Sequence, residues 1–350
     1  MLVVGPSWVG DMVMAQSLFR LLAGRHPGRP LDVLAPGWSL PILARMPEVR
    51  EAIELSAGHG ELRLDERRRL GRVLRRRGYG QAIVLPRSLK AALVPWFARI
   101  PRRTGFRGEH RYGLINDMRP FDAAVLDQTV KRFVALGLEP GEALPDELPR
   151  PGLRVDGARQ ASALERLGLE PATHPVAFMP GAEYGPAKCW PLEYYGELAA
   201  RLGERGHAVW VFGSAKDAGA ARAIAKRAKR AKRAKSAQVA PVVNLCGRTT
   251  LEEAIDLLAA CRCGVTNDSG LMHVAAAVAL PVATLYGSSS PAFTPPLTDR
   301  AAVHYLGLEC SPCFERECPL GHFRCLREIT PERVLASLAE LAGVAEVQTG

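Results

Sequence analysis

Short apolar segments alternate with amphipathic helical segments almost throughout this chain of 350 residues. In the first half, LVV (2–4) and QAIVLP (81–86) each precede a stretch with helical periodicity. In the second half, PVAFMP (175–180), CGVTND (263–268) and PVATLYG (281–287) do the same. Such alternation is typical of parallel sheets with helices on both faces. The chain is therefore predicted to be an α/β protein.

A proline-rich stretch interrupts this alternation once, at LGLEPGEALPDELPRPGLRV (136–155). Its proline density and lack of periodicity predict a linker between two domains, which we place at residues 1–150 and 151–330. Residues 331–350 are predicted to form a C-terminal helix. Because ligands of such folds bind beyond the carboxyl ends of the strands, two domains of this kind predict a cleft between them.

The formal net charge of +10 is concentrated in two segments, DERRRLGRVLRRRG (65–78) and KRAKRAKRAKSAQ (226–238). Charge runs of this kind are usually solvated helices. The alternative is attraction to a phosphate-rich partner, such as an anionic membrane face, a phosphorylated lipid or nucleic acid. Neither segment is accompanied by a motif that recognises RNA or DNA, so we expect no nucleic-acid partner.

The N-terminal residues show neither the basic region nor the apolar region of a secretory signal. The longest apolar run, VAAAVALPVATL (274–285), is interrupted by Pro281 and is shorter than the ~20 residues that span a bilayer. These features predict a cytoplasmic protein.

The segment GPSWVGDMVMAQSL (5–18) turns from the first predicted strand into a helix. Asp11 lies at or near the N-terminus of that helix, and two interpretations of its carboxylate remain open. It stabilises the helix end, or it acts as a general base toward a substrate hydroxyl. Glycines such as Gly10 let a substrate approach the backbone, and Ser7 lies in the same turn.

The segment VTNDSGLMHVAAA (265–277) passes from a buried strand into a helix that begins at Asp268, Ser269 and Gly270. Free N–H groups and the helix dipole make such an N-terminus a natural diphosphate site. Asp268 would then cap the helix or bind a sugar hydroxyl. His273 lies one turn after Ser269, where a core histidine is the alternative interpretation.

The loop PGAEYGPAKCWP (180–191) contains Lys188 between glycines and a proline-flanked tryptophan. A solvated lysine is the common case, and the alternative is neutralisation of a leaving diphosphate. The segment YGSSSPAFTPP (286–296) offers further hydroxyl and N–H groups. Because the chain contains no Asp-x-Asp pair, a carboxylate-held Mg²⁺ is not indicated, and we expect the chemistry to require no cofactor.

Four cysteines lie close together in CSPCFERECPLGHFRC (310–325), at Cys310, Cys313, Cys318 and Cys325. This density in a cytosolic chain favours a metal over permanent disulfides. A structural Zn²⁺ and reduced thiols without metal are the two main interpretations, and reversible disulfides are a third. His322 is a further candidate ligand.

These segments occur in the order found in the ADP-heptose:lipopolysaccharide heptosyltransferases, glycosyltransferase family 9, and the chain resembles that family over nearly its whole length. The resemblance implies a GT-B architecture, in which two Rossmann-like domains face a cleft. The first domain would face the acceptor and the second would bind ADP-heptose. The resemblance also implies that the C-terminal helix packs back on the N-terminal domain.

By position, the resemblance makes Asp11 the catalytic base and Lys188 the residue that stabilises the leaving diphosphate. Asp268, Ser269, Gly270 and His273 match the donor-binding pattern, and Ser7 and Gly10 lie in the acceptor loop. The implied reaction is inverting transfer of L-glycero-D-manno-heptose from ADP-heptose to heptosyl-Kdo2-lipid A, which adds the second heptose of the lipopolysaccharide inner core. Such an enzyme would contact the cytoplasmic leaflet of the inner membrane peripherally.

Two other functions remain as alternatives. One is heptosyltransferase I, or another sugar-nucleotide enzyme of the same fold, because fold-level similarity does not determine the acceptor. The other, from a different class, is a nucleic-acid-binding protein that uses the basic helices and shows steeply salt-dependent binding.

Overall fold

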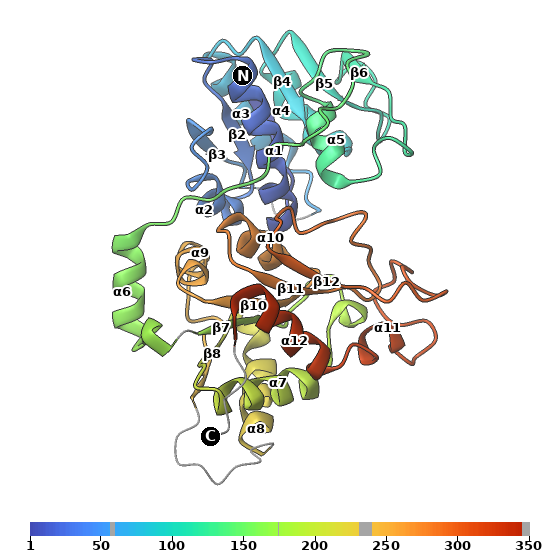
Figure 1. Cartoon of the computed structure of the whole chain (residues 1–350). Helices are drawn as coiled ribbons and strands as arrows, with labels where there is room; N and C mark the ends of the chain where they lie inside the picture. The colour runs from blue at the N-terminus through green and yellow to red at the C-terminus, as the bar shows by residue number, and fades with distance from the viewer. Residues whose placement is uncertain (57–59, 174, 231–239, 345–350) are drawn as a thin grey trace. The chain divides into compact units, whose positions relative to one another are not determined.

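The computed structural model describes residues 1–56, 60–173, 175–230 and 240–344. The chain divides into two compact units, Met1–Arg154 (unit 1) and Val155–Gly350 (unit 2), which Figure 1 shows in blue to green and in green to red. The division falls within the proline-rich stretch 136–155, from which the linker was predicted.

The described residues of unit 1 contain a six-stranded parallel sheet in the order β3-β2-β1-β4-β5-β6. Its strands are β1 (Leu2–Val4), β2 (Asp32–Ala35), β3 (Glu51–Glu54), β4 (Gln81–Val84), β5 (Arg102–Phe106) and β6 (Asp117–Arg119). Its helices are α1 (Val9–Arg25), α2 (Leu40–Leu43), α3 (Leu64–Arg75), α4 (Leu89–Phe97) and α5 (Thr129–Ala135). The sequence predicted β1 to β4 but not β5 and β6, because these two strands contain few consecutive apolar residues.

The described residues of unit 2 contain a second six-stranded parallel sheet, in the order β12-β11-β10-β7-β8-β9. Its strands are β7 (Val176–Met179), β8 (Val209–Val211), β9 (Val242–Asn244), β10 (Cys263–Asn267), β11 (Val282–Leu285) and β12 (Ala301–His304). Its helices are α6 (Gly157–Leu167), α7 (Leu192–Glu204), α8 (Ala218–Arg230), α9 (Leu251–Ala259), α10 (Gly270–Ala277), α11 (Arg324–Arg327) and α12 (Pro331–Ala342). Helix α8 contains the start of the basic repeat, and residues 231–238 of that repeat lie outside the described residues.

Both sheets have the strand order of the Rossmann fold. In each, the chain builds outward to one edge and then returns, so that β1 pairs with β4 in unit 1 and β7 pairs with β10 in unit 2. The connections from these neighbouring strands leave on opposite faces, which opens a crevice at the carboxyl edge where ligands of this fold bind. Within each unit, this topology determines where a site can form.

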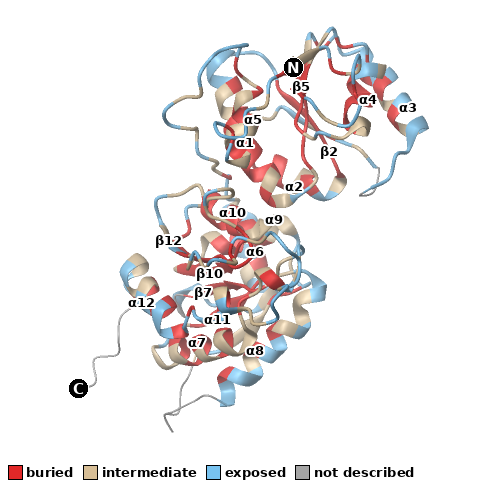
Figure 2. Cartoon of the chain, turned by 90° about the vertical axis from the view of Figure 1, so that its right-hand side faces the viewer, coloured by how far each residue is buried: buried red, intermediate tan, exposed pale blue. Residues whose placement is uncertain are grey.

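Buried apolar residues of the strands and of the inner helix faces form the core of each unit (Figure 2). The terminal helix α12 contributes Val334, Leu335 and Leu338 to the core of unit 2, where it contacts α7, β10, β11 and β12. The apolar face of this helix therefore belongs to unit 2, which corrects the prediction that it packs on the N-terminal domain. Within the described parts of the chain, none of the helices has the length and apolar character needed to span a bilayer.

Helices α3 and α4 pack closely at Gly71. A Cβ atom at this position would lie 2.4 Å from the Cβ of Phe97 and 3.0 Å from the carbonyl oxygen of Val94. Both atoms are fixed parts of α4, so a larger residue would force the two helices apart.

We expect Gly71→Ala to lower the free energy of unfolding of unit 1 by about 1–3 kcal/mol, because overpacking strains the core. Gly24→Ala in α1 is the matched control, since no atom lies within 4 Å of its Cβ position. Urea unfolding followed by tryptophan fluorescence measures both variants. If Gly71→Ala were as stable as Gly24→Ala, close packing would not be the reason for glycine at position 71.

Candidate functional site

Asp11 lies in the first turn of α1, directly after the loop that follows β1. The helix begins at Val9, and the side chain of its N-cap residue, Trp8, makes no capping hydrogen bond. Asp11 is half-buried, and the partial positive charge of a helix N-terminus stabilises a carboxylate in this position. Both interpretations of Asp11, helix stabilisation and general base, are compatible with this placement.

The loop that contains Ser7 is tied to the neighbouring strand and to the segment after it. The carbonyl oxygen of Ser7 accepts a hydrogen bond from Trp38 Nε1 at 2.8 Å, and the N–H of Gly5 donates to Leu34 O at 2.9 Å. Gly10 is buried within α1. The predicted acceptor loop is therefore a firmly bonded part of the sheet edge in unit 1.

Arginines gather at the same edge of unit 1. The guanidinium groups of Arg87 and Arg132 stack on the ring of Phe121, 4.9 and 5.2 Å from its centroid. Arg111 is buried and donates to carbonyl oxygens that follow β4 and end β5, and burial, with the nearby charge of Arg87, lowers its pKa to about 10. Three arginines therefore lie at the edge that carries Asp11, with Glu109 close to Arg111.

Lys188 and Asp268 form an ion pair where β7 and β10 lie side by side in unit 2. The Nζ of Lys188 lies 2.5 Å from Oδ2 of Asp268, and the two side chains are 18% and 5% exposed. Lys188 ends a short turn (Pro186–Lys188) after β7, and Asp268 follows β10 directly. The structure thus brings together two predicted residues that are 80 positions apart.

The second oxygen of Asp268 is held by the segment that follows β11. Thr294 donates its hydroxyl to Oδ1 of Asp268 at 3.3 Å, and the carbonyl oxygen of Thr294 accepts from the hydroxyl of Tyr286 at 2.7 Å. Both carboxylate oxygens are therefore engaged. The charge of Asp268 is balanced by Lys188, so the two side chains together do not repel an anion as an isolated carboxylate would.

Helix α10 begins beside this ion pair, and its first backbone N–H groups donate no hydrogen bond to the side chain of the N-cap residue. Ser269 is the N-cap residue, and its side chain makes no capping hydrogen bond. In the described residues, the hydroxyl oxygens of Ser269, Ser288 and Ser289 are buried and have no partner. Because a buried hydroxyl without a partner costs free energy and a helix N-terminus attracts anions, the site is suited to a ligand with several oxygen acceptors.

His273 is buried in α10, below this helix end. Burial lowers its pKa to about 4, the charge of Asp268 opposes that shift, and Lys188 adds to it. The imidazole is therefore neutral near pH 7. At this site the positive charge comes from Lys188 and from the helix dipole, and His273 supplies only a neutral hydrogen-bonding group.

Asn267 fastens the lysine loop to the sheet, although the sequence analysis did not single it out. Its Oδ1 accepts from the N–H of Trp190 at 3.1 Å and from the hydroxyl of Tyr195 at 3.2 Å, and its Nδ2 donates to Pro180 O at 2.6 Å. The sequence signal that could have identified Asn267 was its place as a polar residue at the end of a buried strand.

Tyr184 and Gly185 connect the lysine loop to the cysteine-containing segment. The Nζ of Lys188 lies 5.1 Å from the centroid of the Tyr184 ring, and the guanidinium of Arg316 lies 5.8 Å from it. A Cβ at Gly185 would lie 2.4 Å from the carbonyl oxygen of Arg316. Only glycine allows this close approach, so the segment around Arg316 helps to position Lys188.

The four clustered cysteines are free thiols that influence one another. Burial raises the pKa of Cys325 to about 11, and Cys318, Cys310 and Cys313 add to that shift. Burial opposes ionisation of Cys318, but backbone N–H groups nearby, among them that of Phe323, lower its pKa overall. In the described residues, no three His, Cys, Asp or Glu side chains are arranged to hold one metal ion.

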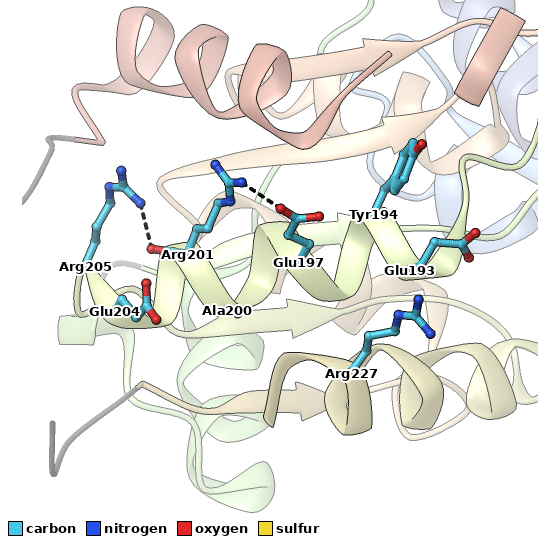
Figure 3. Close-up of a pocket in the computed structure, with 8 residues that line it drawn as sticks. All are labelled: Glu193, Tyr194, Glu197, Ala200, Arg201, Glu204, Arg205 and Arg227. Atoms are coloured by element: carbon cyan, nitrogen blue, oxygen red, sulfur yellow. Dashed lines mark hydrogen bonds and ion pairs between the residues drawn. The ribbon is translucent and has the colours of Figure 1, made fainter. Parts of the chain in front are cut away.

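A separate depression of about 550 Å³ lies over α7 and α8 and is lined mostly by charged side chains (Figure 3). Glu197 partly neutralises Arg201, with which it pairs at 2.6 Å, and Arg205 donates to the carbonyl oxygen of Arg201 at 2.9 Å. None of the candidate residues lines it. We therefore locate the candidate site at the carboxyl edges of the sheets.

Two Rossmann-like units in one chain, each with polar and charged groups at the carboxyl edge of its sheet, are the architecture of glycosyltransferases of the GT-B class. The family model described as glycosyltransferase family 9 (heptosyltransferase) matches residues 67–324. The chain belongs to this family.

Two relatives match almost the entire chain. Lipopolysaccharide heptosyltransferase 2 of Escherichia coli (strain K12) is 46% identical over 345 residues, which cover 97% of each chain. The enzyme of the same name from Salmonella typhimurium is 47% identical over 345 residues, with the same coverage. The solved structure of E. coli ADP-heptose lps heptosyltransferase II has a TM-score of 0.85 at 45% identity and covers 97% of this chain and 98% of that one. The predicted fold class is therefore confirmed.

We expect Asn267→Ala to lower the free energy of unfolding of unit 2 by at least about 2 kcal/mol, since each buried partner left unsatisfied costs about 1–3 kcal/mol. Asn116→Ala is the matched control, because Asn116 makes a similar set of hydrogen bonds at an exposed position where water replaces them. Urea unfolding measures both variants. Equal losses would show that Asn267 does not fasten the lysine loop.

Proposed function

We propose that this enzyme transfers L-glycero-D-manno-heptose from ADP-heptose to heptosyl-Kdo2-lipid A with inversion of configuration, in the synthesis of the lipopolysaccharide inner core. The observation that carries this proposal is the Lys188–Asp268 pair beside the N-terminus of α10. It combines a cation, a helix dipole and buried hydroxyls without partners, which is the chemistry that a sugar diphosphate requires.

In the proposed reaction, the acceptor hydroxyl attacks the anomeric carbon of heptose, and the bond from that carbon to the diphosphate oxygen breaks. Asp11 removes the proton of the attacking hydroxyl as general base. Lys188 and the N–H groups at the start of α10 stabilise the negative charge that develops on the ADP. Because His273 is neutral near pH 7, we assign it a hydrogen bond to the donor and no part in neutralising charge.

Donor binding requires Lys188 to share its charge between Asp268 and the diphosphate. Asp268 and Ser269 lie at the same strand end, and Gly270 lets the first turn of α10 approach the ligand closely. We assign Asp268 to a heptose hydroxyl, since a carboxylate that accepts from Lys188 and Thr294 still has a free lone pair. This arrangement uses no metal ion in the chemistry.

On the acceptor side, we assign Ser7 and Gly10 to the loop that meets the acceptor. Lipid A and Kdo carry phosphates and carboxylates, and the stacked Arg87 and Arg132 at the same sheet edge offer matching charge. The enzyme would work in the cytoplasm, in peripheral contact with the inner membrane that holds this lipid.

Assays with purified acceptors that contain or lack the first heptose test the proposed acceptor against that of heptosyltransferase I. The enzyme should transfer heptose only to the acceptor that already contains the first heptose.

Asp11→Asn should reduce turnover by about 10²–10⁴-fold, the usual contribution of a general base, while the dissociation constant for ADP-heptose changes little. Asp65→Asn is the matched control, because Asp65 is also an acidic residue in the first turn of a helix. Radiolabelled heptose transfer and calorimetry measure the two quantities. If Asp11→Asn kept more than about a tenth of wild-type turnover, Asp11 would be left with the helix-stabilising function alone.

Lys188→Ala should weaken the binding of ADP by about tenfold or more, as expected for loss of a charge-assisted contact, and leave adenosine binding nearly unchanged. Lys216→Ala is the control, since Lys216 is an exposed lysine of the same unit, paired with Glu183. Isothermal titration calorimetry compares the two ligands. Equal weakening for adenosine and ADP would mean that Lys188 does not contact phosphate.

We also propose that Cys310, Cys313, Cys318 and Cys325 bind one structural Zn²⁺. The influence of the other three thiols on the pKa of Cys325 supports this because it indicates that the four lie near one another. The lowered pKa of Cys318 also supports it, because zinc binds thiolates. Zinc binding would require the four thiols to move closer together than they lie in this structure. We assign this segment no part in catalysis.

Protein purified without chelator should contain about one Zn²⁺ per chain, and Cys310→Ser/Cys313→Ser should lose it and melt at a lower temperature, since a metal site stabilises the fold that forms it. Cys189→Ser, outside the cluster, should keep the metal. Elemental analysis and thermal melts provide the readout. Metal-free wild-type protein with four freely titrating thiols would leave the cysteines as reduced residues.

A further inference from the structure

Helix α3 carries unpaired positive charge on the surface of unit 1. Four arginines of the helix and the arginine that follows it are exposed: Arg68, Arg69, Arg72, Arg75 and Arg76. Of the neighbouring carboxylates, Glu66 pairs with Arg63 and Glu51 with Arg77, and Asp65 lies in the first turn of the same helix. In the described residues, none of these five arginines forms an ion pair. Within the part of the chain that the structure describes, no ion pair neutralises the charge of these arginines.

Large apolar side chains are also exposed on α3 and on the neighbouring helix α4. Trp96, at the end of α4, is 45% exposed, and on α3 Val73 is 53% and Leu64 is 48% exposed. The Trp96 ring packs edge-on against Phe97, with 4.9 Å between the ring centroids, which fixes it on the surface. The exposed tryptophan of α4 and the exposed arginines of α3 together have the composition of a membrane-interface contact.

The packing of the two helices brings these groups together. Gly71 touches Phe97 and lies against the backbone of Ala98, so the end of α4 meets the middle of α3. Arg68 and Arg75 are three residues before and four residues after Gly71, and helix periodicity places them beside that contact. The exposed Arg99 lies two residues after the end of α4. Figure 2 shows α3 and α4 adjacent, with the outer surface of α3 exposed.

We propose that this α3–α4 face, comprising Arg68, Arg72, Arg75, Trp96 and Arg99, docks unit 1 on an anionic phospholipid bilayer. Guanidinium groups bind lipid phosphates in a forked geometry, and the indole ring enters the headgroup region. This inference rests on the proposed function, in which the acceptor is a lipid of that bilayer.

The apolar component distinguishes a bilayer from other anionic partners. Trp96 and Val73 gain nothing from the phosphate backbone of a nucleic-acid duplex, whereas the membrane interface accepts both. A second copy of the chain is disfavoured as the occupant, because two such faces carry charge of the same sign. Charge complementarity and the exposed indole therefore both favour the lipid surface.

The test is co-sedimentation of the full chain with vesicles of phosphatidylcholine containing about 30% phosphatidylglycerol, compared with pure phosphatidylcholine. Wild-type protein should bind only the anionic vesicles, and less at high salt. Arg68→Gln/Arg72→Gln/Arg75→Gln should lower the partition coefficient about 100-fold, at about fivefold for each arginine near the surface. Trp96→Ala should lower it further in the same background.

Lys226→Gln/Lys229→Gln/Arg230→Gln on α8 is the matched control, because it removes the same charge from the other basic helix and should leave vesicle binding nearly unchanged. Turnover on a water-soluble acceptor should be unchanged in both triple variants. Vesicle binding that falls in the α8 variant and not in the α3 variant would overturn the proposal, as would loss of soluble-acceptor turnover in the α3 variant. Equal binding to duplex DNA, removed by the same α3 changes, would identify a nucleic-acid surface instead. Failure of heptose transfer with vesicle binding intact would overturn the proposed function alone.

Discussion

The parallel strand order of each unit is the constraint on which the rest of this structure depends. Because β7 lies next to β10, the loop that carries Lys188 and the strand end that carries Asp268 meet at one edge. The same order in unit 1 places β1 next to β4, so that Asp11 shares an edge with Arg87. A parallel sheet directs all its carboxyl ends the same way, and the chemistry of each unit gathers there.

The charges of Lys188 and Asp268 balance each other at the carboxyl edge of unit 2. Asp268 is buried and would be costly without a partner, and Lys188 and Thr294 satisfy both of its oxygens. Burial keeps His273 neutral. The groups that attract an anion are therefore the N-terminus of α10 and Lys188, whose charge is shared with Asp268. The hydroxyls of Ser269, Ser288 and Ser289, which have no partner within the described residues, supply neutral donors.

Positive charge in unit 1 occurs in two different settings. At the sheet edge, Arg87 and Arg132 are held on Phe121, and Arg111 is buried among carbonyl oxygens. On α3, Arg68, Arg69, Arg72 and Arg75 are exposed and form no ion pair within the described residues. Restrained guanidinium groups suit the recognition of one ligand geometry, whereas exposed ones without ion pairs suit a fluid surface whose charges are not fixed in position.

The sequence by itself determined the α/β class, the two-domain division near the linker and the segments that carry Asp11, Lys188 and Asp268. Hydrophobic periodicity and glycine-rich turns are local patterns, so they can be recognised in the sequence without knowledge of the fold. The strands β5, β6 and β12 were missed because their stability comes from neighbours in the sheet, which a local pattern does not record. Only the tertiary structure paired Lys188 with Asp268 across 80 residues, gave Asn267 its three partners and assigned α12 to unit 2. Contacts of this kind depend on which strands lie side by side, and that order is decided by packing of the whole unit.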